Sequence, residues 1–335
     1  MSFDAILHRY FPEGRWEIEQ GHSGWNNTTR FVRADGRRWV LRIYETHKDE
    51  EKIRFEHRLL KKLNEVNLSF RVPKPAACED GSTIVRLEDG TGRLACLFAY
   101  IDGDRPEEGA VEAAESLGET TGELVHALAA LELPDAPAYA HYYEIEASYP
   151  WCTPDKVASF CAEPPAGLEE EASALRLIAE ELDGFRAYAP RFRLLPHQLI
   201  HGDINFSNCL VSADKSGRIG AVLDFEFCTR DLRAMEIAVV LSGFLGADSG
   251  AYTIEAFLRG AGRRLRLSRE EAEAIPGLIR LRTLDVFLHF LNRYFDGVDG
   301  VAVLKEQTAS AARNLIRLNG ENGWLTDRVE KYLMQ

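Results

Sequence analysis

The sequence of 335 residues lacks the long apolar run of a membrane protein and the leader pattern of an exported one. Its longest candidate run, residues 237–247, is interrupted by Ser242 and Gly243 and is shorter than the ~18 residues that a membrane-spanning helix requires. The amino-terminal residues, MSFDAILHRYFPEG, do not place a basic segment before an apolar one. We therefore expect a cytoplasmic protein without a membrane partner.

Cysteine is also scarce, and its spacing is irregular. The six cysteines lie at positions 78, 96, 152, 161, 209 and 228, with no Cys-x-x-Cys pair and no matching His-x-x-x-His. This spacing argues against a zinc site and against a disulfide framework. We expect most of the cysteines to be reduced and to pack as small, partly buried hydrophobic residues.

Basic charge is in short supply, since the formal net charge is −13. A nucleic-acid partner is therefore not expected, because phosphate backbones require clustered Lys and Arg. The acidity is concentrated in residues 104–183, which carry 19 acidic and 3 basic side chains, a balance of −16, so that the other residues together carry +3. This stretch could attract a cationic substrate, or it could be Glu-rich for solubility alone.

What the sequence does contain is enough apolar material for a core and a motif suited to phosphoryl transfer. Hydrophobic residues make up 45% of the chain, and its length favours about two domains. Residues 199–227 place Asp203 and Asn208 five residues apart on a short loop, and Asp224 follows the apolar run 219–223. Asp203 suits a base that accepts the proton of an attacking hydroxyl, and Asn208 and Asp224 suit oxygen ligands of magnesium.

Protein kinases carry the same parts as His-Arg-Asp-x-x-x-x-Asn followed by Asp-Phe-Gly. This chain has Gly202 in place of that Arg and Glu226 in place of that Gly. The spacing of Asp203, Asn208 and Asp224 is kept. With these two differences, the motif resembles that of the aminoglycoside phosphotransferase, choline kinase and homoserine kinase family, whose loop is His-Gly-Asp-x-x-x-x-Asn. The resemblance extends over roughly residues 21–246.

The resemblance implies an α+β, protein-kinase-like fold of two lobes. A β-rich nucleotide-binding lobe would comprise residues 1–102, and a helical lobe with the catalytic loop and acceptor site would comprise residues 103–335. It also implies an enzyme that uses ATP and Mg²⁺ to phosphorylate an alcohol. His201 is then expected to brace the loop, because Asp203 already suits the role of the base.

Several residues of the first lobe are candidates for holding the nucleotide. A small polar loop with Ser23, Gly24 and Asn27 would let backbone N–H groups approach phosphates. Arg42 stands in the strand RRWVLRIYE where kinase-like folds have Lys, and a guanidinium can also bind phosphate oxygens. Glu56, on the following predicted helix, would pair with Arg42 and fix it toward the phosphates.

The end of a predicted strand, LFAYIDGD, lies where the resembled fold has the hinge between its lobes. Phe98, Tyr100 and Ile101 would line the adenine slot there, although an apolar edge strand would look the same. The assignment depends on the order of elements along the chain.

The periodicity of apolar residues predicts the remaining elements. Strands are expected at 38–44, 82–87 and 93–100, with a hairpin at Ala34-Asp35-Gly36, and helices at 48–64, 112–131, 168–186, 252–260, 276–295, 301–318 and 326–333. Residues 134–167 show no clean period. They could form a specificity surface or a packed connector.

We expect a kinase that phosphorylates a hydroxyl of a small molecule, either an amino alcohol such as homoserine or an aminoglycoside. LRIYE followed by FEHRLLKKLN looks most like the homoserine-kinase-like branch, which also includes protein Ser/Thr kinases, and fold alone does not decide between them. The alternatives are therefore a protein Ser/Thr kinase and a nucleotide-binding module with weak catalysis, the latter because Arg42 replaces the usual Lys.

Overall fold

A computed structural model describes residues 3–20, 27–45, 49–133, 139–212, 214 and 216–334. The chain forms two compact units. The first comprises Met1–Arg105, Leu131–Ala138 and Asn208–Glu226, and the second comprises Pro106–Ala130, Tyr139–Ser207 and Phe227–Gln335. The chain thus passes between the units several times. The division into functional lobes after residue 102 stays a prediction.

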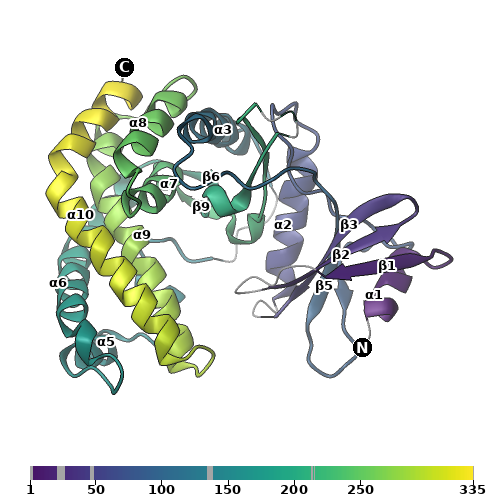
Figure 1. Cartoon of the computed structure of the whole chain (residues 1–335), viewed down its shortest axis with the longest axis horizontal. Coiled ribbons are helices and arrows are strands. Elements are labelled where there is room, and N and C mark those ends of the chain that lie inside the picture. The colour runs from purple at the N-terminus through teal and green to yellow at the C-terminus, as the bar shows by residue number, and fades with distance from the viewer. Residues whose placement is uncertain are drawn as a thin grey trace. The chain divides into compact units, whose positions relative to one another are not determined.

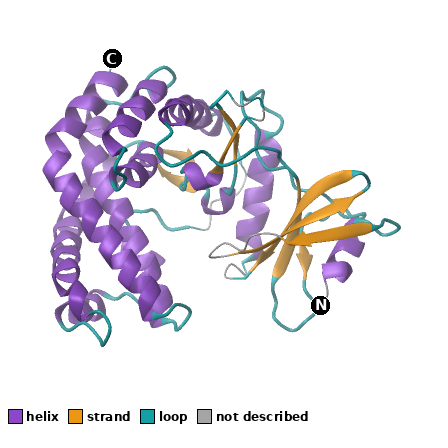
Figure 2. Cartoon of the chain, viewed as in Figure 1, coloured by secondary structure: helices purple, strands orange, loops and turns teal. Residues whose placement is uncertain are grey.

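The first unit is built on an antiparallel sheet (Figures 1 and 2). In the described residues this sheet has five strands in the order β1-β2-β3-β5-β4. Its elements are α1 (Phe3–Tyr10), β1 (Trp16–Gln20), β2 (Asn27–Ala34), β3 (Arg37–Tyr44), α2 (Glu50–Leu63), β4 (Val85–Arg86) and β5 (Leu94–Ala99). The predicted hairpin is confirmed, because Asp35 and Gly36 both have positive φ, 51° and 69°, as a tight turn matched to strand twist requires.

The two faces of β3 separate the core of this unit from its candidate site. Leu41 and Ile43 are buried in a cluster with α1 and β2, and each such side chain stabilises the fold by about 1.5–3 kcal/mol. Arg42 and Tyr44 alternate with them and lie on the opposite face. The predicted helix over 48–64 is confirmed as α2, whose N-cap Asp49 accepts the Glu51 N–H at 3.0 Å.

A short antiparallel pair, β7 (Cys209–Val211) and β8 (Ile219–Val222), completes the first unit. It is attached to the rest of that unit through backbone hydrogen bonds, such as the 2.9 Å bond that the Arg71 N–H donates to the Gly220 carbonyl. Because the two strands are antiparallel, Asn208, just before β7, and Asp224, shortly after β8, lie at the same end of this pair.

The second unit is mainly helical (Figure 2). Its elements are α3 (Val111–Ala129), α4 (Ile145–Ser148), α5 (Pro154–Ala162), α6 (Ala172–Tyr188), β6 (His197–Ile200), β9 (Thr229–Leu232), α7 (Met235–Leu245), α8 (Gly250–Ala261), α9 (Arg269–Phe295) and α10 (Val301–Leu333). The long helices α9 and α10 lie side by side, and β6 pairs with β9 just before the catalytic loop (Figure 1). None of the described helices is both long enough and apolar enough to cross a bilayer.

Two predicted helix boundaries were wrong. The helix expected at 276–295 begins at Arg269, where Ser268 and Glu271 form a capping box, so Pro276 lies inside α9. The helices expected at 301–318 and 326–333 are one helix, α10, which continues through two glycines. Burial of Leu318, Leu325 and further residues along one face outweighs the ~1 kcal/mol that each glycine costs in a helix.

Helices α3 and α8 pack so closely that their backbones meet. A Cβ added at Gly260 would overlap the carbonyl oxygen of Glu115, and one added at Gly118 would overlap that of Phe257. These glycines therefore permit an approach that any side chain would prevent.

Candidate active site

In the first unit, Arg42 of β3 connects two carboxylates. Its Nη1 lies 3.0 Å from Oδ1 of Asp224 and 3.6 Å from Oε1 of Glu56. Burial lowers the pKa of Arg42, but the effect of Asp224, Tyr44 and Glu56 is opposite and larger. The pKa therefore stands well above its ordinary value. Arg42 therefore remains a cation, placed between Glu56 of α2 and Asp224, the second residue after β8.

Glu56 is the partner that the sequence predicted for Arg42. Its side chain is 2% exposed, and the Tyr44 hydroxyl donates to its Oε2 at 3.0 Å. Burial raises the pKa of Glu56 to about 7, although the guanidinium of Arg42 favours the ionised form. The pair fixes the position of Arg42. Its role toward a nucleotide stays a prediction.

Asp224 has an unusual backbone. Its φ is 65°, in the left-handed region that residues other than glycine rarely occupy. In the described part of the chain, its buried Oδ1 makes no hydrogen bond of ordinary geometry, although Arg42 is within ion-pair distance. A strained backbone and a buried carboxylate oxygen without a hydrogen bond are features typical of a ligand position.

Asn208 is held beside Asp224 by the backbone. Its carbonyl oxygen accepts the Leu223 N–H at 2.7 Å, and its residue is 9% exposed. One carboxylate and one amide side chain thus come from adjacent points of the same unit. Both types of oxygen suit Mg²⁺, so these residues fit the metal that the sequence predicted.

Asn27 is the first residue of β2, and it is 8% exposed. Its Nδ2 donates to Oε2 of Glu226 at 2.7 Å. Ser23 and Gly24, the other predicted phosphate-loop residues, lie outside the described residues. Glu226, which the sequence marked only as a departure from the kinase pattern, is thus a neighbour of a predicted site residue.

The predicted hinge residues continue from β5. Phe98 is 5% exposed, and its ring lies 5.5 Å from the Arg42 guanidinium, on the same face of the sheet. The Tyr100 N–H donates to the Arg38 carbonyl at 3.2 Å, and the Arg38 guanidinium lies 4.0 Å from the Tyr100 ring. Ile101 is half-buried. An adenine contact at this segment stays a prediction.

In the second unit, a buried glutamate fixes the loop that carries Asp203 through hydrogen bonds to its backbone. Glu236 of α7 is fully buried and accepts the N–H groups of His201 and Gly202, the latter at 3.4 Å. Burial raises the pKa of Glu236 to about 7. Nδ1 of His201 accepts the Asp203 N–H at 3.1 Å, so this histidine braces the loop.

Arg282 of α9 holds the side chain of Asp203. Its Nη2 donates to Asp203 Oδ1 at 2.5 Å, and its Nη1 donates at 3.1 Å to both Asp285 Oδ2 and the Tyr142 hydroxyl. That hydroxyl in turn donates to the Gly202 carbonyl at 2.5 Å. Burial lowers the pKa of Arg282, but Tyr142, Asp203 and Asp285 raise it well above the ordinary value. Sequence reasoning missed this network, because its members are far apart in the chain.

A cavity of about 240 Å³ opens beside Asp203 and Arg282, between α7, α9 and α10. Of the side chains that line it, only those two are charged. The others are neutral, and the polar ones include Ser242, Thr283, Gln307 and Asn314. None of the lining residues comes from the acidic stretch 104–183.

The β-sheet of the first unit, the helices of the second and the His-Gly-Asp loop define a phosphotransferase of the protein-kinase-like fold. A model of the phosphotransferase enzyme family matches residues 17–274, and the chain belongs to this family. The predicted fold class, family and enzymatic nature are therefore confirmed.

The chain is also similar to individual proteins of known activity. A homoserine kinase of Methylobacillus flagellatus is 28% identical over 273 residues, which cover 81% of this chain and 77% of that protein. A microcompartment-associated aminopropanol kinase aligns with a TM-score of 0.69 at 18% identity, covering 97% of this chain and 99% of that one. An amicoumacin kinase in complex with AMP-PNP and Ca²⁺ aligns with a TM-score of 0.64 at 17% identity, covering 93% of each chain.

Proposed function

We propose that this phosphotransferase moves the γ-phosphate of ATP, with Mg²⁺, to the hydroxyl of a small amino alcohol of the homoserine or aminopropanol type. Asp203 accepts the hydroxyl proton, the hydroxyl oxygen forms the new bond to phosphorus, and the bond to the bridging oxygen of ADP breaks. Arg42 binds the nucleotide phosphates, and Glu56 holds Arg42 in position. Asn208 and Asp224 would hold magnesium, which would neutralise charge on the phosphates.

The observation that carries the proposal is the carboxylate of Asp203 beside a small cavity of its own unit. Arg282 donates to this carboxylate and fixes its orientation, and a carboxylate is a group that can accept the proton of a hydroxyl. A nucleotide-binding module without turnover has no use for such an arrangement. The cavity next to it supplies a place for an acceptor.

The size of this cavity favours a small acceptor over an aminoglycoside. Its volume of about 240 Å³ lies below the roughly 300–1,000 Å³ of pockets that enclose drug-sized ligands. Its charged lining is one cation and one anion, a balance that suits a zwitterionic or neutral alcohol. A polycationic antibiotic would require several carboxylates. The names of the homoserine and aminopropanol kinases above agree with the smaller class of acceptor.

The test is a screen for ADP formation from ATP and Mg²⁺ with homoserine, aminopropanol, choline, kanamycin and a generic protein as acceptors. We expect turnover with an amino alcohol and none with Asp203→Asn. Asp183→Asn is the matched control, because Asp183 is exposed on α6 and lies outside the cavity lining. Preference for kanamycin or for the protein, or full activity of Asp203→Asn, would contradict the proposal.

A further inference from the structure

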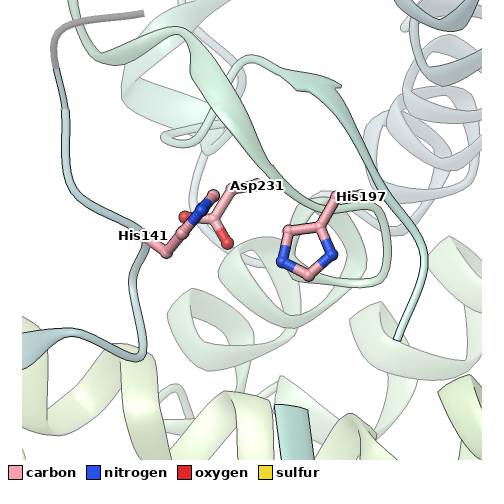
Figure 3. Close-up of side chains that lie close together, drawn as sticks. All are labelled: His141, His197 and Asp231. Atoms are coloured by element: carbon pink, nitrogen blue, oxygen red, sulfur yellow. The ribbon is translucent and has the colours of Figure 1, made fainter. Parts of the chain in front are cut away.

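We propose that the second unit carries a separate metal site, formed by His141, His197 and Asp231, for a zinc-class ion. His141 precedes α4, His197 begins β6, and Asp231 lies in β9 (Figure 3). One possible ligand atom from each residue lies within 4.8 Å of the other two. In Figure 3 the carboxylate of Asp231 is drawn beside the ring of His141, with the imidazole of His197 nearby.

His197 is held in the tautomer that a metal needs. Its Nδ1 lies 2.7 Å from the Leu195 carbonyl oxygen. Because a carbonyl oxygen can only accept, Nδ1 carries the proton, and the lone pair is on Nε2. A histidine that donates one ring N–H to a backbone carbonyl while the other nitrogen faces the metal is the usual arrangement in metal sites.

Asp231 is fixed in place and still has capacity for a metal. It is fully buried and accepts the N–H groups of Leu232 and Tyr142, each at 2.6 Å. An ionised carboxylate offers about four lone-pair positions, so two remain. The backbone bonds orient the carboxylate as the hydrogen bonds around metal-binding carboxylates do.

His141 supplies the strongest indication. Its Nδ1 is buried, and within the described residues it has no hydrogen-bond partner. Buried polar atoms nearly always find a partner, so a lone one calls for an explanation. The imidazole stacks on Tyr143 with ring centroids 5.1 Å apart, which holds it beside Asp231 and His197. An ion bound through Nδ1 would satisfy this nitrogen.

The donor set selects the ion. Two imidazole nitrogens and one carboxylate suit Zn²⁺ or Co²⁺, whereas Mg²⁺ and Ca²⁺ prefer oxygen ligands only. At Zn–N distances of about 2.0–2.1 Å, the ligand atoms of a tetrahedral site lie ~3.4 Å apart, so a group that now lies within 4.8 Å contracts on binding. The Tyr143 hydroxyl, now 3.1 Å from Nε2 of His197, gives up that contact to the ion.

The site adjoins the scaffold of the catalytic loop. Tyr142 donates its backbone N–H to Asp231, and its hydroxyl contacts both the Gly202 carbonyl and Arg282. A bound ion would therefore tie the segment around Tyr142 to β6 and β9. Sequence spacing could not reveal the site, since its three ligands are far apart in the chain.

The test is binding of Co²⁺ and Zn²⁺ to metal-free protein in excess Mg²⁺, followed by the visible absorption of Co²⁺ and by calorimetry. We expect one tightly bound ion per chain, a tetrahedral Co²⁺ spectrum, and affinity weakened by about 100-fold or more in His141→Ala. His126→Ala is the matched control, because His126 is exposed on α3 and outside the cluster, and it should bind as the wild type does.

His141→Ala is the variant of choice because its Nδ1 makes no hydrogen bond among the described residues, so the change removes a ligand without breaking a hydrogen bond of that nitrogen. Asp231→Asn provides a second, nearly isosteric test and should also weaken binding. Equal affinities of wild type, His141→Ala and Asp231→Asn would overturn the site. Wild-type protein that gives no tetrahedral Co²⁺ spectrum would overturn it as well.

Discussion

The buried carboxyl of Glu236 should make the stability of the second unit depend on pH in a predictable direction. Its folded pKa is about 7, against 4.5 for an ordinary glutamate. Between these two values the folded chain binds a proton that the unfolded chain does not. Stability from this group is therefore fully present below about pH 4.5 and is lost as the pH rises through about 7.

Glu236→Gln isolates this effect. Glutamine does not titrate, and its Oε1 can still accept the N–H of His201. From about pH 5.5 to about pH 8, the shift from 4.5 to about 7 corresponds to a loss of about 2 kcal/mol in wild-type stability. The difference in unfolding free energy, wild type minus Glu236→Gln, should fall by that amount over this range.

The assay is urea unfolding at several pH values, followed by far-UV circular dichroism, which reports mainly on the helical second unit. Taking the difference between two chains cancels the pH dependence that both share. Glu180→Gln, on the exposed side of α6, controls for the loss of one negative charge. A constant difference between wild type and Glu236→Gln would refute the reasoning, since the carboxyl would then titrate alike in both states.

Three further predictions concern the site and the helix packing. Arg282→Met should destabilise the protein by about 3–5 kcal/mol, because it leaves buried carboxylates without their cation. Adding Asp285→Asn should restore part of that loss in urea unfolding. Equal stabilities of the single and the double variant would contradict this. Arg42→Lys should keep part of the activity with a raised KM for ATP in steady-state kinetics, because an ammonium group keeps the charge but cannot form the paired hydrogen bonds of a guanidinium. An inactive variant would imply a geometry that only guanidinium provides. Gly260→Ala should destabilise by about 1–3 kcal/mol through overlap with α3, whereas Gly184→Ala, in open space on α6, should stabilise by up to ~1 kcal/mol; thermal melts that rank the two in the opposite order would exclude the close packing.

Features that depend on neighbours in the sequence could be predicted. The hairpin at Asp35-Gly36 follows from turn chemistry, and the loop of Asp203 and Asn208 follows from a short motif. The approach of Glu56 to Arg42 follows from the order of a strand and the next helix. In each of these cases the interacting residues are separated by few positions along the chain.

Features that depend on tertiary packing could not be predicted. Arg282 pairs with Asp203 across 79 residues, and an arginine on a long helix carries no local sign of such a partner. Glu236 was equally invisible, since its partners are backbone N–H groups. The length of α10 was missed because burial, which cannot be read from propensity, outweighs two helical glycines.

The acidic stretch 104–183 acquires a structural explanation in the second unit. Glu115 of α3 lies 2.6 Å from Arg259 of α8, and Glu181 of α6 lies 2.6 Å from Arg280 of α9. Partly exposed pairs of this kind contribute at most about 1 kcal/mol each, but they neutralise the charge of one set of helices with that of another. The excess of acid in the middle of the chain thus complements the arginines of its carboxyl-terminal part.

This neutralisation bears on the choice of substrate. Carboxylates that already pair with arginines create a weaker field for a cationic ligand than the sequence count implies. None of them lines the cavity beside Asp203, so charge selectivity there depends on Asp203 and Arg282 themselves. Because these two groups are of opposite sign and already paired, the acceptor that disturbs them least is one whose own charges balance. A zwitterionic acceptor such as homoserine meets that condition fully, aminopropanol brings a single net positive charge, and a polycation brings several.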